Sequence, residues 1–241
     1  MYLSITLFSG VSTLFAVLFD LEGTLVQSVE GDHDAILEFR SRTREKLLEL
    51  GIPSSELRNL TRSTLIRNKA REYVEEHFSK KRAKQFHVKI DKFLKSYELR
   101  WADQSRIFPD TLSALQKLES LGYKMGIVTN TSKEAANRIL DIHGMQDFFE
   151  VVVTREDVKM LKPHPEGILI ALRRLEVKDF FFIGDLVHDS QAAKEADGIS
   201  IIVNRNQFKK LKFNPHHVVR SLLEISHLAR TQKTHDLNES I

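Results

Sequence analysis

Acidic and hydroxyl side chains stand at the ends of three short apolar runs of this 241-residue chain. Asp20 directly follows one run, Thr129 ends another, and Asp185 comes one glycine after a third. Apolar runs of this length are typical of strands buried on both faces of a parallel sheet. In open parallel α/β sheets the functional crevice lies outside the carboxyl ends of the strands. We therefore expect the three side chains to meet at one place.

Two further acidic residues accompany them. Glu22 lies two residues after Asp20, and Asp189 lies four residues after Asp185. An acid that leaves a core strand is costly unless it is paired or metal-bound, and carboxylates are ligands that Mg²⁺ prefers. The pattern therefore predicts a divalent-cation site. A simple turn with an Asx cap at residues 20–24 is the alternative interpretation.

Two other segments carry polar groups that could be functional, but each also has a simpler interpretation. Thr129 and Asn130 could be a strand end followed by a helix cap. The segment Lys162-Pro163-His164-Pro165 could be a rigid turn into a helix that starts at Glu166, with the lysine solvated. These residues by themselves leave both interpretations open.

Apolar runs that alternate with helical patterns indicate the fold class. The five runs are residues 14–19, 124–129, 148–153, 180–183 and 199–203. Helical patterns separate the last four, and one of these helices begins with a capping-box sequence at residues 131–134 and can end at Gly144. Such alternation implies right-handed crossovers. We predict an α/β fold with a Rossmann-like parallel sheet of about five strands.

Residues 27–107 break this alternation, because they show helical patterns alone. One pattern ends at Gly51, a second covers residues 54–78, and a third has an apolar stripe from Phe86 to Trp101. We therefore predict a helical cap domain at residues 27–107. The α/β core domain would consist of residues 1–26 and 108–241.

Charge and composition narrow the function classes. The net charge is +3, but residues 27–107 carry 18 Lys and Arg against 13 Asp and Glu, whereas residues 108–203 carry 11 against 15. A basic insert can attract an anionic substrate and an acidic core can hold a cation, although solvated helix faces would give the same balance. The absence of cysteine excludes disulfides, thiolate metal sites and Cys nucleophiles.

The N-terminal residues do not predict a membrane anchor. The uncharged stretch 2–19 is broken by polar residues, and no apolar run reaches the ~18–20 residues of a membrane helix. The stretch also lacks the basic start of a signal peptide. We expect a cytoplasmic protein with no membrane partner, in which the first dozen residues contribute nothing to function.

The motifs in this order resemble those of the haloacid dehalogenase (HAD) superfamily of phosphohydrolases, most closely its phosphoglycolate phosphatase-like branch. The start of that branch, Phe-Asp-x-Asp-Gly-Thr-Leu, is matched from Phe19 to Leu25 with one departure. The later motifs Thr-Asn, Lys-Pro-x-Pro-Glu and Gly-Asp-x-x-x-Asp follow in order. Each motif is weak alone, whereas the four together are specific. The similarity covers residues 14–26 and 107–204, and the insert matches only in place and helical character.

The resemblance implies a phosphatase that forms an aspartyl-phosphate. Asp20 would be the nucleophile that attacks phosphorus. Thr129 and Lys162 would stabilise the transferring phosphoryl group, and Gly23 and Asn130 would lie beside it in the phosphate site. The implied substrate is a small phosphorylated metabolite, a phosphoglycolate-like phosphomonoester.

The resemblance also implies a Mg²⁺ cofactor. Asp20, Asp185 and the backbone carbonyl of Glu22 would hold the ion, and Asp189 would hold the shell around it. The ion would reduce the repulsion between Asp20 and the phosphate.

Glu22 departs from the family pattern, which has Asp there as the general acid and base. Glutamate keeps the carboxyl group but moves it by about an ångström or more, and a displacement of that size can cost ~10²-fold in rate. Glutamate at this place also occurs in the acireductone synthase branch, but Leu25 fits that branch less well. We expect an active phosphatase.

Other activities of the superfamily remain as alternatives. A dehalogenase needs neither Mg²⁺ nor an acid at position 22, so the pair Asp185 and Asp189 disfavours it. A phosphonatase normally has a small residue at position 22. A phosphomutase shares every motif, and phosphate release into water would distinguish it. A non-catalytic binding protein, disabled by Glu22, is the alternative from another class.

The basic residues of the insert could contact a phosphorylated substrate or a nucleic acid. Arg40, Arg42, Arg44 and Arg62 are candidate substrate contacts. The basic stretch 80–95 lies on a predicted helix with an apolar face and is accompanied by no nucleic-acid motif. A solvated face, or steering of a phosphorylated substrate, is therefore favoured over a nucleic-acid partner. We expect a monomer or homodimer.

Replacing Glu22 by Gln tests its role as the acid. We expect the turnover number to fall by roughly 10²–10⁴-fold, the usual contribution of general acid–base catalysis. Binding of phosphate analogues should persist, because the replacement keeps the size of the side chain. Steady-state kinetics with vanadate inhibition would measure both, and unchanged turnover would refute the assignment.

Overall fold

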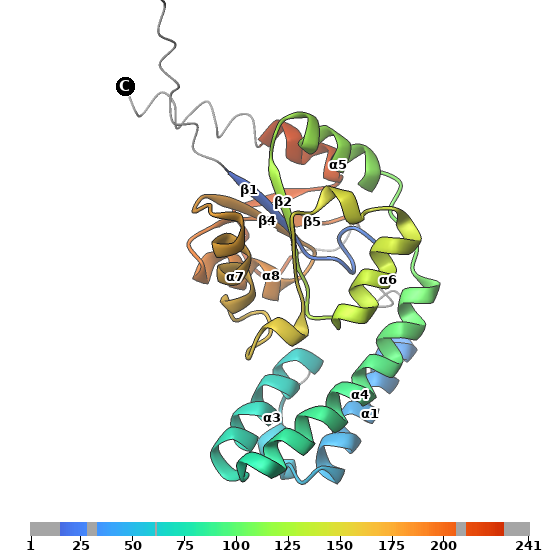
Figure 1. Cartoon of the computed structure of the whole chain (residues 1–241), viewed down its shortest axis with the longest axis vertical. Helices are drawn as coiled ribbons and strands as arrows, with labels where there is room; N and C mark the ends of the chain where they lie inside the picture. Colours follow the sequence, from blue (N-terminus) through green and yellow to red (C-terminus); the bar gives the residue numbers. More distant parts are fainter. Residues whose placement is uncertain (1–14, 28–32, 61, 206–210, 229–241) are drawn as a thin grey trace, which may run out of the picture.

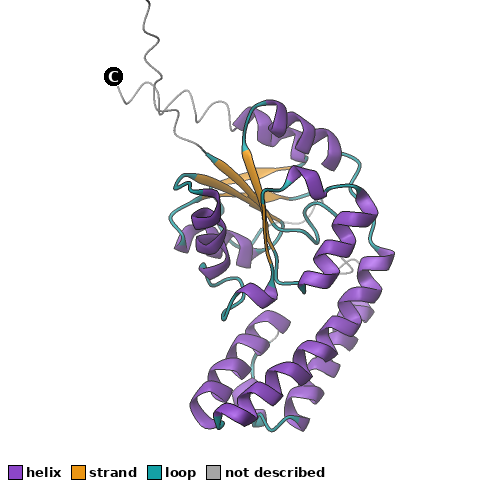
Figure 2. Cartoon of the chain, in the orientation of Figure 1, coloured by secondary structure: helices purple, strands orange, loops and turns teal. Residues whose placement is uncertain are grey.

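A parallel six-stranded sheet forms the centre of the protein (Figure 2). The computed structural model describes residues 15–27, 33–60, 62–205 and 211–228. The strand order is β3-β2-β1-β4-β5-β6. The strands are β1 (Ala16–Phe19), β2 (Lys124–Val128), β3 (Val151–Val153), β4 (Phe180–Gly184), β5 (Ile199–Val203) and β6 (His217–Val219). The predicted α/β fold with a Rossmann-like parallel sheet is therefore confirmed.

Helices cover both faces of this sheet (Figure 1). One face packs against α5 (Thr111–Ser120) and α6 (Lys133–His143), and the other against α7 (Glu166–Leu175) and α8 (Val187–Glu195). The four residues of β1 are fully buried because both faces are covered. Helix α6 begins at Ser132, which accepts a hydrogen bond from the amide of Ala135, and ends at Gly144 in the left-handed conformation.

The sheet differs from the prediction at two places. The run 148–153 contains a strand only from Val151, because Gln146–Phe148 form a 3-10 helix. The sixth strand, β6, was not predicted. It is a short edge strand, and its central residue Val218 is 51% exposed, so its sequence lacks the wholly apolar character of the inner strands.

The insert folds as helices with a hydrophobic cluster of their own. These are α1 (His33–Glu49), α2 (Ser54–Leu57), α3 (Ser63–His77) and α4 (Lys80–Gln104). The predicted single helical stretch 54–78 is two helices. Asn59 has a positive φ of 67° between them, and the Arg44 guanidinium donates to the carbonyls of Leu57 and Leu60 at 2.6 and 2.7 Å.

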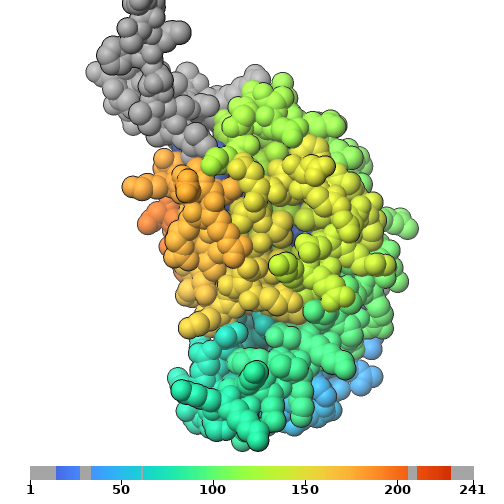
Figure 3. Space-filling model, viewed as in Figure 1, coloured from blue at the N-terminus to red at the C-terminus, as the bar shows by residue number. Residues whose placement is uncertain are grey.

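The chain passes between the sheet and the helical insert at two neighbouring points. Val26 pairs with Ile107 in an antiparallel bridge, and the amide of Gln27 donates to the carbonyl of Arg106 at 2.7 Å. In the space-filling view the insert, coloured blue to green, contacts the core along a continuous seam (Figure 3). The domain boundaries at 27 and 107 stay a prediction.

None of the helices in the described ranges has the length and apolarity to cross a membrane. The predictions for the first dozen residues and for the tail after Thr231 fall outside the described residues.

Candidate active site

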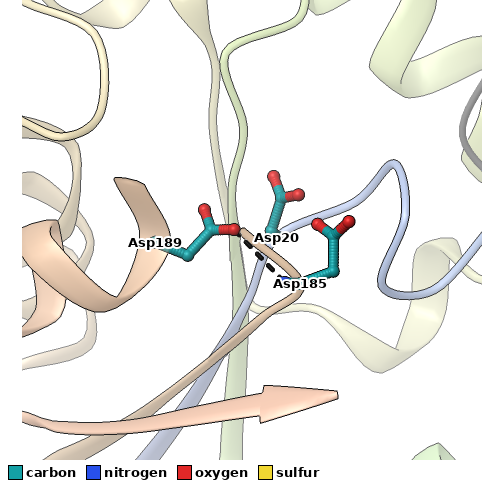
Figure 4. Close-up of side chains that lie close together, drawn as sticks. All are labelled: Asp20, Asp185 and Asp189. Atoms are coloured by element: carbon teal, nitrogen blue, oxygen red, sulfur yellow. Dashed lines mark hydrogen bonds between the residues drawn. The ribbon is translucent and has the colours of Figure 1, made fainter. Parts of the chain in front are cut away.

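Three carboxylates converge at the carboxyl ends of two adjacent strands. Asp20 follows β1, whereas Asp185 and Asp189 follow β4, which pairs with β1. One oxygen from each lies within 4.8 Å of the others. Figure 4 shows the three carboxylates side by side, with Asp20 between the other two in this view. The structure thus brings together three residues that the sequence predicted to be close.

A tight turn after β1 makes room for this cluster. The amide of Asp20 donates to the carbonyl of Ile183 at 2.8 Å, which fixes the end of β1 against β4. Gly23 follows with φ +87°, a conformation that favours glycine. A Cβ at this position would lie 2.5 Å from a carboxylate oxygen of Asp185. Glycine is therefore required for both the turn and the close approach.

Asp189 stabilises the second turn. Its Oδ2 accepts a hydrogen bond from the amide of Asp185 at 3.2 Å (Figure 4). It also accepts one from the amide of Leu186 at 3.0 Å. Gly184 precedes this turn, and a Cβ there would lie 2.4 Å from the Cβ of Asp189. Asp189 therefore orients the backbone that carries Asp185.

Lys162 joins Asp20 to Asp189. Its Nζ lies 2.7 Å from Oδ1 of Asp20 and 2.8 Å from Oδ1 of Asp189, and only 2% of its side chain is exposed. Burial alone would lower the pKa of Lys162, but attraction to Asp189 and Asp20 outweighs it and raises the pKa. The ammonium group therefore stays charged between the two carboxylates.

The two carboxylates differ in their preference for the ionised form. Burial raises the pKa of Asp20 to about 6, although Lys162 opposes the shift and the charge of Asp189 adds to it. Burial also acts on Asp189, but Lys162 and the hydrogen bond from Leu186 outweigh it, so the pKa of Asp189 is lowered. Asp189 is therefore the carboxylate that stays ionised beside Lys162, whereas the ionised form of Asp20 is disfavoured by its burial.

The donor set fits a hard divalent cation. Asp20, Asp185 and Asp189 present three oxygen ligands within 4.8 Å of one another, and the Lys162 ammonium contacts two of these carboxylates. Three ionised carboxylates this close repel one another, and a Mg²⁺ ion would relieve that repulsion. The side chain of Glu22 is not part of this cluster, so its place in the predicted metal site rests on its backbone carbonyl.

Glu22 is held by a residue that the sequence did not single out for the site. The hydroxyl of Thr131 donates to Oε2 of Glu22 at 2.8 Å. The sequence assigned Thr131 to a helix cap, but Ser132 is the capping residue, which leaves the Thr131 hydroxyl for Glu22. The Thr131 amide donates to Oγ1 of Thr129 at 3.2 Å. Thr129 and Glu22 are thus linked through Thr131.

Two asparagines hold the loop that carries Lys162. Oδ1 of Asn130 accepts from the amide of Lys162 at 3.0 Å, and its Nδ2 donates to the Lys162 carbonyl at 3.4 Å. Asn68 of α3 forms the same pair of bonds with Leu161, both at 3.0 Å. Asn68 is buried, and no sequence motif marks it. The side chain of Asn130 thus bonds to the backbone of this loop. The contact between Asn130 and phosphate stays a prediction.

A cavity of about 150 Å³ lies between the insert and the strand ends. Asp20, Glu22, Thr129 and Asn130 line it from the core, and residues of α1, α3 and α4 line it from the insert. His188 also lines it, and burial lowers its pKa, which favours the neutral imidazole. Because roughly 10–15 Å³ is enough to hold one water molecule, the cavity has room for several waters or a small metabolite.

Of the four arginines predicted to contact substrate, only Arg40 is among the residues that line this cavity. Arg44 donates to the backbone carbonyls of Leu57 and Leu60 inside the insert. Arg42 lies near Glu38 and Glu45 in exposed ion pairs, and Arg62 is the residue before α3. The basic stretch on α4 is partly paired, since Lys95 lies 3.2 Å from Glu134 of the core.

Comparison with known proteins identifies the family to which this chain belongs. Residues 17–203 match the family described as "Haloacid dehalogenase-like hydrolase". The chain is 33% identical over 193 residues to pyrophosphatase PpaX of Bacillus velezensis, covering 75% of this chain and 79% of that protein. The PpaX protein of Bacillus thuringiensis is 30% identical over 189 residues, covering 75% and 78%.

Solved structures show the same fold. A HAD phosphatase from Thermococcus onnurineus has a TM-score of 0.56 and 27% identity, covering 90% of this chain and 98% of that chain. A β-phosphoglucomutase from Clostridium difficile has a TM-score of 0.59 and 22% identity, covering 93% and 98%. The second likeness supports the fold alone.

The opposite pKa shifts predict opposite effects on stability in EDTA at pH 7.5. Asp20→Asn should leave the melting temperature unchanged or raise it, because it removes a carboxylate whose ionised form folding disfavours. Asp189→Asn should destabilise by about 1–3 kcal/mol, because it weakens charge-assisted hydrogen bonds in a buried site. Thermal unfolding of both variants would measure this difference.

The pH dependence supplies the control. As the pH falls from about 6 toward 3.8, folded Asp20 takes up its proton before the unfolded chain does, so this group favours folding at low pH. The difference between wild type and Asp20→Asn should therefore shrink over that range. An Asp20→Asn variant less stable than Asp189→Asn would contradict this assignment.

Proposed function

The chain belongs to the haloacid dehalogenase-like hydrolase family as one of its phosphatases, and we propose that it hydrolyses a small phosphomonoester through a phosphorylated Asp20. The observation that carries the proposal is the contact of 2.7 Å between Lys162 and Asp20 within the carboxylate cluster. This contact keeps a buried carboxylate next to a fixed positive charge, where an anionic phosphoryl group can be received. Thr129 lies at the same strand ends and lines the same cavity.

The nucleophile is Asp20. Its carboxylate oxygen attacks phosphorus and the bond to the leaving oxygen breaks, which gives an acyl phosphate that water then hydrolyses. Lys162 offsets negative charge on the phosphoryl oxygens in a buried setting, where such charge–charge attraction is strong. Because the family branch places Thr129 on a phosphoryl oxygen, we assign its hydroxyl to that contact. Asn130 holds the Lys162 backbone in place.

Glu22 is the proton donor to the leaving group and the base for the incoming water. Its carboxyl lines the cavity and accepts a hydrogen bond from Thr131. That bond compensates for the extra methylene of glutamate, because it fixes the longer side chain in one orientation.

We infer Mg²⁺ as the cofactor. Asp20, Asp185 and the Glu22 carbonyl would hold it, with Asp189 behind them. When bound, it neutralises charge between the nucleophile and the phosphoryl group. The family and the acidic cluster support this choice.

The helical insert is proposed to act as a cap that closes over the site. Asn68 of α3 binds the backbone of Leu161, next to Lys162, so closure of the insert and placement of the lysine are linked. Closure of this kind excludes water and selects the substrate. The resemblance favours a phosphoglycolate-like substrate, and the PpaX relatives add pyrophosphate as a second substrate to test.

Phosphate release tests the proposal. With p-nitrophenyl phosphate we expect release that depends on Mg²⁺ and stops in EDTA. Asp20→Asn should lose activity by at least roughly 10³-fold, as expected when a covalent nucleophile is removed. Phosphate release from wild type at the level of the Asp20→Asn variant, with natural phosphomonoesters as well, would overturn the function. Transfer of phosphate to a second sugar hydroxyl instead of water would indicate the phosphomutase alternative.

Asn68 provides a test of the cap. Asn68→Leu removes both bonds to Leu161 without adding a charge, and a displacement of the reacting groups of about 1 Å costs ~10²-fold. We expect kcat to fall at least tenfold. Glu76→Leu is the control, because Glu76 is an exposed residue of the same helix and does not line the cavity; its kcat should equal that of wild type. An Asn68→Leu variant with wild-type kcat would show that α3 does not position the lysine loop.

A further inference from the structure

We propose that Arg155, together with Arg67 and Arg40, forms a subsite for a second anionic group of the substrate. The inference rests on the proposed phosphatase function and names the class of its substrates: small phosphate esters or diphosphates whose leaving group carries a negative charge of its own. The subsite lies in the cavity between the insert and the strand ends, and Asp20 lines the same cavity.

Arg155 is the central residue of this subsite. It follows β3 and belongs to the core, and only 1% of its side chain is exposed. Its Nη1 donates to Oε1 of Glu98 on α4. Its Nε and Nη2 are buried and have no hydrogen-bond partner among the described residues, although Nε lies 3.6 Å from Oδ1 of Asp91, so Nη2 is the donor without an acidic neighbour there. A buried guanidinium with unused donors is costly unless a ligand completes it, and the side chain lines the cavity.

Arg67 adds a second guanidinium close by. Its Nη2 lies 3.1 Å from Oδ1 of Asp91 on α4. Burial, and next to it the positive charge of Arg155, lower the pKa of Arg67 to about 10, so it remains charged near neutral pH. Nη2 of Arg67 and Nε of Arg155 lie 3.1 and 3.6 Å from the same oxygen, Oδ1 of Asp91, so the two cations are close enough to repel each other. An anion that binds at both would relieve it.

Arg40 supplies a positive charge from α1. It lines the cavity, is half-buried, and forms no hydrogen bond or ion pair with any residue in the described ranges. Glu98 and Asp91 are the acidic partners of Arg155 and Arg67. With three arginines against two carboxylates, this part of the cavity keeps an excess of positive charge.

The buried hydroxyl of Thr43 is a further donor for an anionic group of the substrate. Its Oγ1 has no hydrogen-bond partner among the described residues, and Thr43 lines the cavity beside Arg40 on α1. A hydroxyl and guanidinium groups are the donors that carboxylates and phosphates accept. Because Glu98 also accepts the amide of Ser132 at 3.1 Å, it stays in place when Arg155 turns its free donors to a ligand.

A matched pair of substrates tests the subsite. 2-Phosphoglycolate and 2-hydroxyethyl phosphate have the same two-carbon chain, but only the first carries a carboxylate. The measured quantity is the ratio of their kcat/KM values, which does not depend on the fraction of folded enzyme. We expect wild type to prefer 2-phosphoglycolate by roughly 10- to 100-fold, the size of a charge-assisted hydrogen-bond pair. Inorganic pyrophosphate extends the test to a phosphate leaving group.

Three variants locate the effect. Arg155→Met combined with Glu98→Gln removes both charges of the buried pair and keeps an acceptor for Ser132, and it should lower the ratio at least tenfold. Arg40→Met breaks no ion pair and should lower it severalfold. Arg138→Met is the matched control, because Arg138 also joins the core to α4, through Asp103, but does not line the cavity. Its ratio should equal that of wild type.

The outcomes separate this inference from the function on which it rests. A wild-type ratio near one, or a ratio unchanged in the Arg155→Met/Glu98→Gln variant, would overturn the subsite while leaving the phosphatase intact. A ratio that falls equally in Arg138→Met would overturn it as well. If wild type released phosphate from none of these compounds or from p-nitrophenyl phosphate, the proposed function itself would fail.

Discussion

A lysine ammonium buried between two aspartates is the interaction on which the rest of the site depends. Lys162 contacts Asp20 and Asp189 at 2.7 and 2.8 Å with almost no exposure to water. Charges in such a place are costly unless geometry and further hydrogen bonds compensate. The surrounding structure supplies both: β1 and β4 present the aspartates, the turn amides hold Asp189, and Asn130 holds the lysine backbone. Compensation is incomplete at Asp20, because burial raises its pKa to about 6 in spite of Lys162, and the proposed mechanism uses its ionised form as the nucleophile.

The helical insert takes part in this arrangement. Asn68 binds the residue before Lys162, and Glu98 pairs with buried Arg155 of the core. Both contacts join α3 or α4 to loops at the strand ends, so the insert in this position completes the walls of the cavity. A substrate that binds to both bodies would favour the closed arrangement, and specificity and closure would then share the same residues.

The core of the site follows from the sequence because it depends on strand ends. Asp20, Thr129 and Asp185 meet since parallel strands end at one edge of the sheet, and the motif order adds Lys162. The missed residues depend on contacts between distant segments. Asn68 and Leu161 are 93 positions apart, and Arg155 and Glu98 are 57 apart. No local pattern encodes such pairs. The edge strand β6 was missed because its three residues form no apolar run like those of the inner strands. The break between α2 and α3 was missed because residues 58–62 contain neither glycine nor proline.

The most direct test of the account is to identify the phosphorylated residue. The enzyme would be acid-quenched during turnover with Mg²⁺ and a phosphomonoester, reduced with borohydride, and digested for peptide mass spectrometry. Reduction converts an acyl phosphate on aspartate to homoserine. The account predicts homoserine at position 20, absent when the substrate is left out. Homoserine at Asp185 or Asp189 instead, or an unmodified Asp20 beside a phosphorylated serine, threonine or histidine, would contradict it.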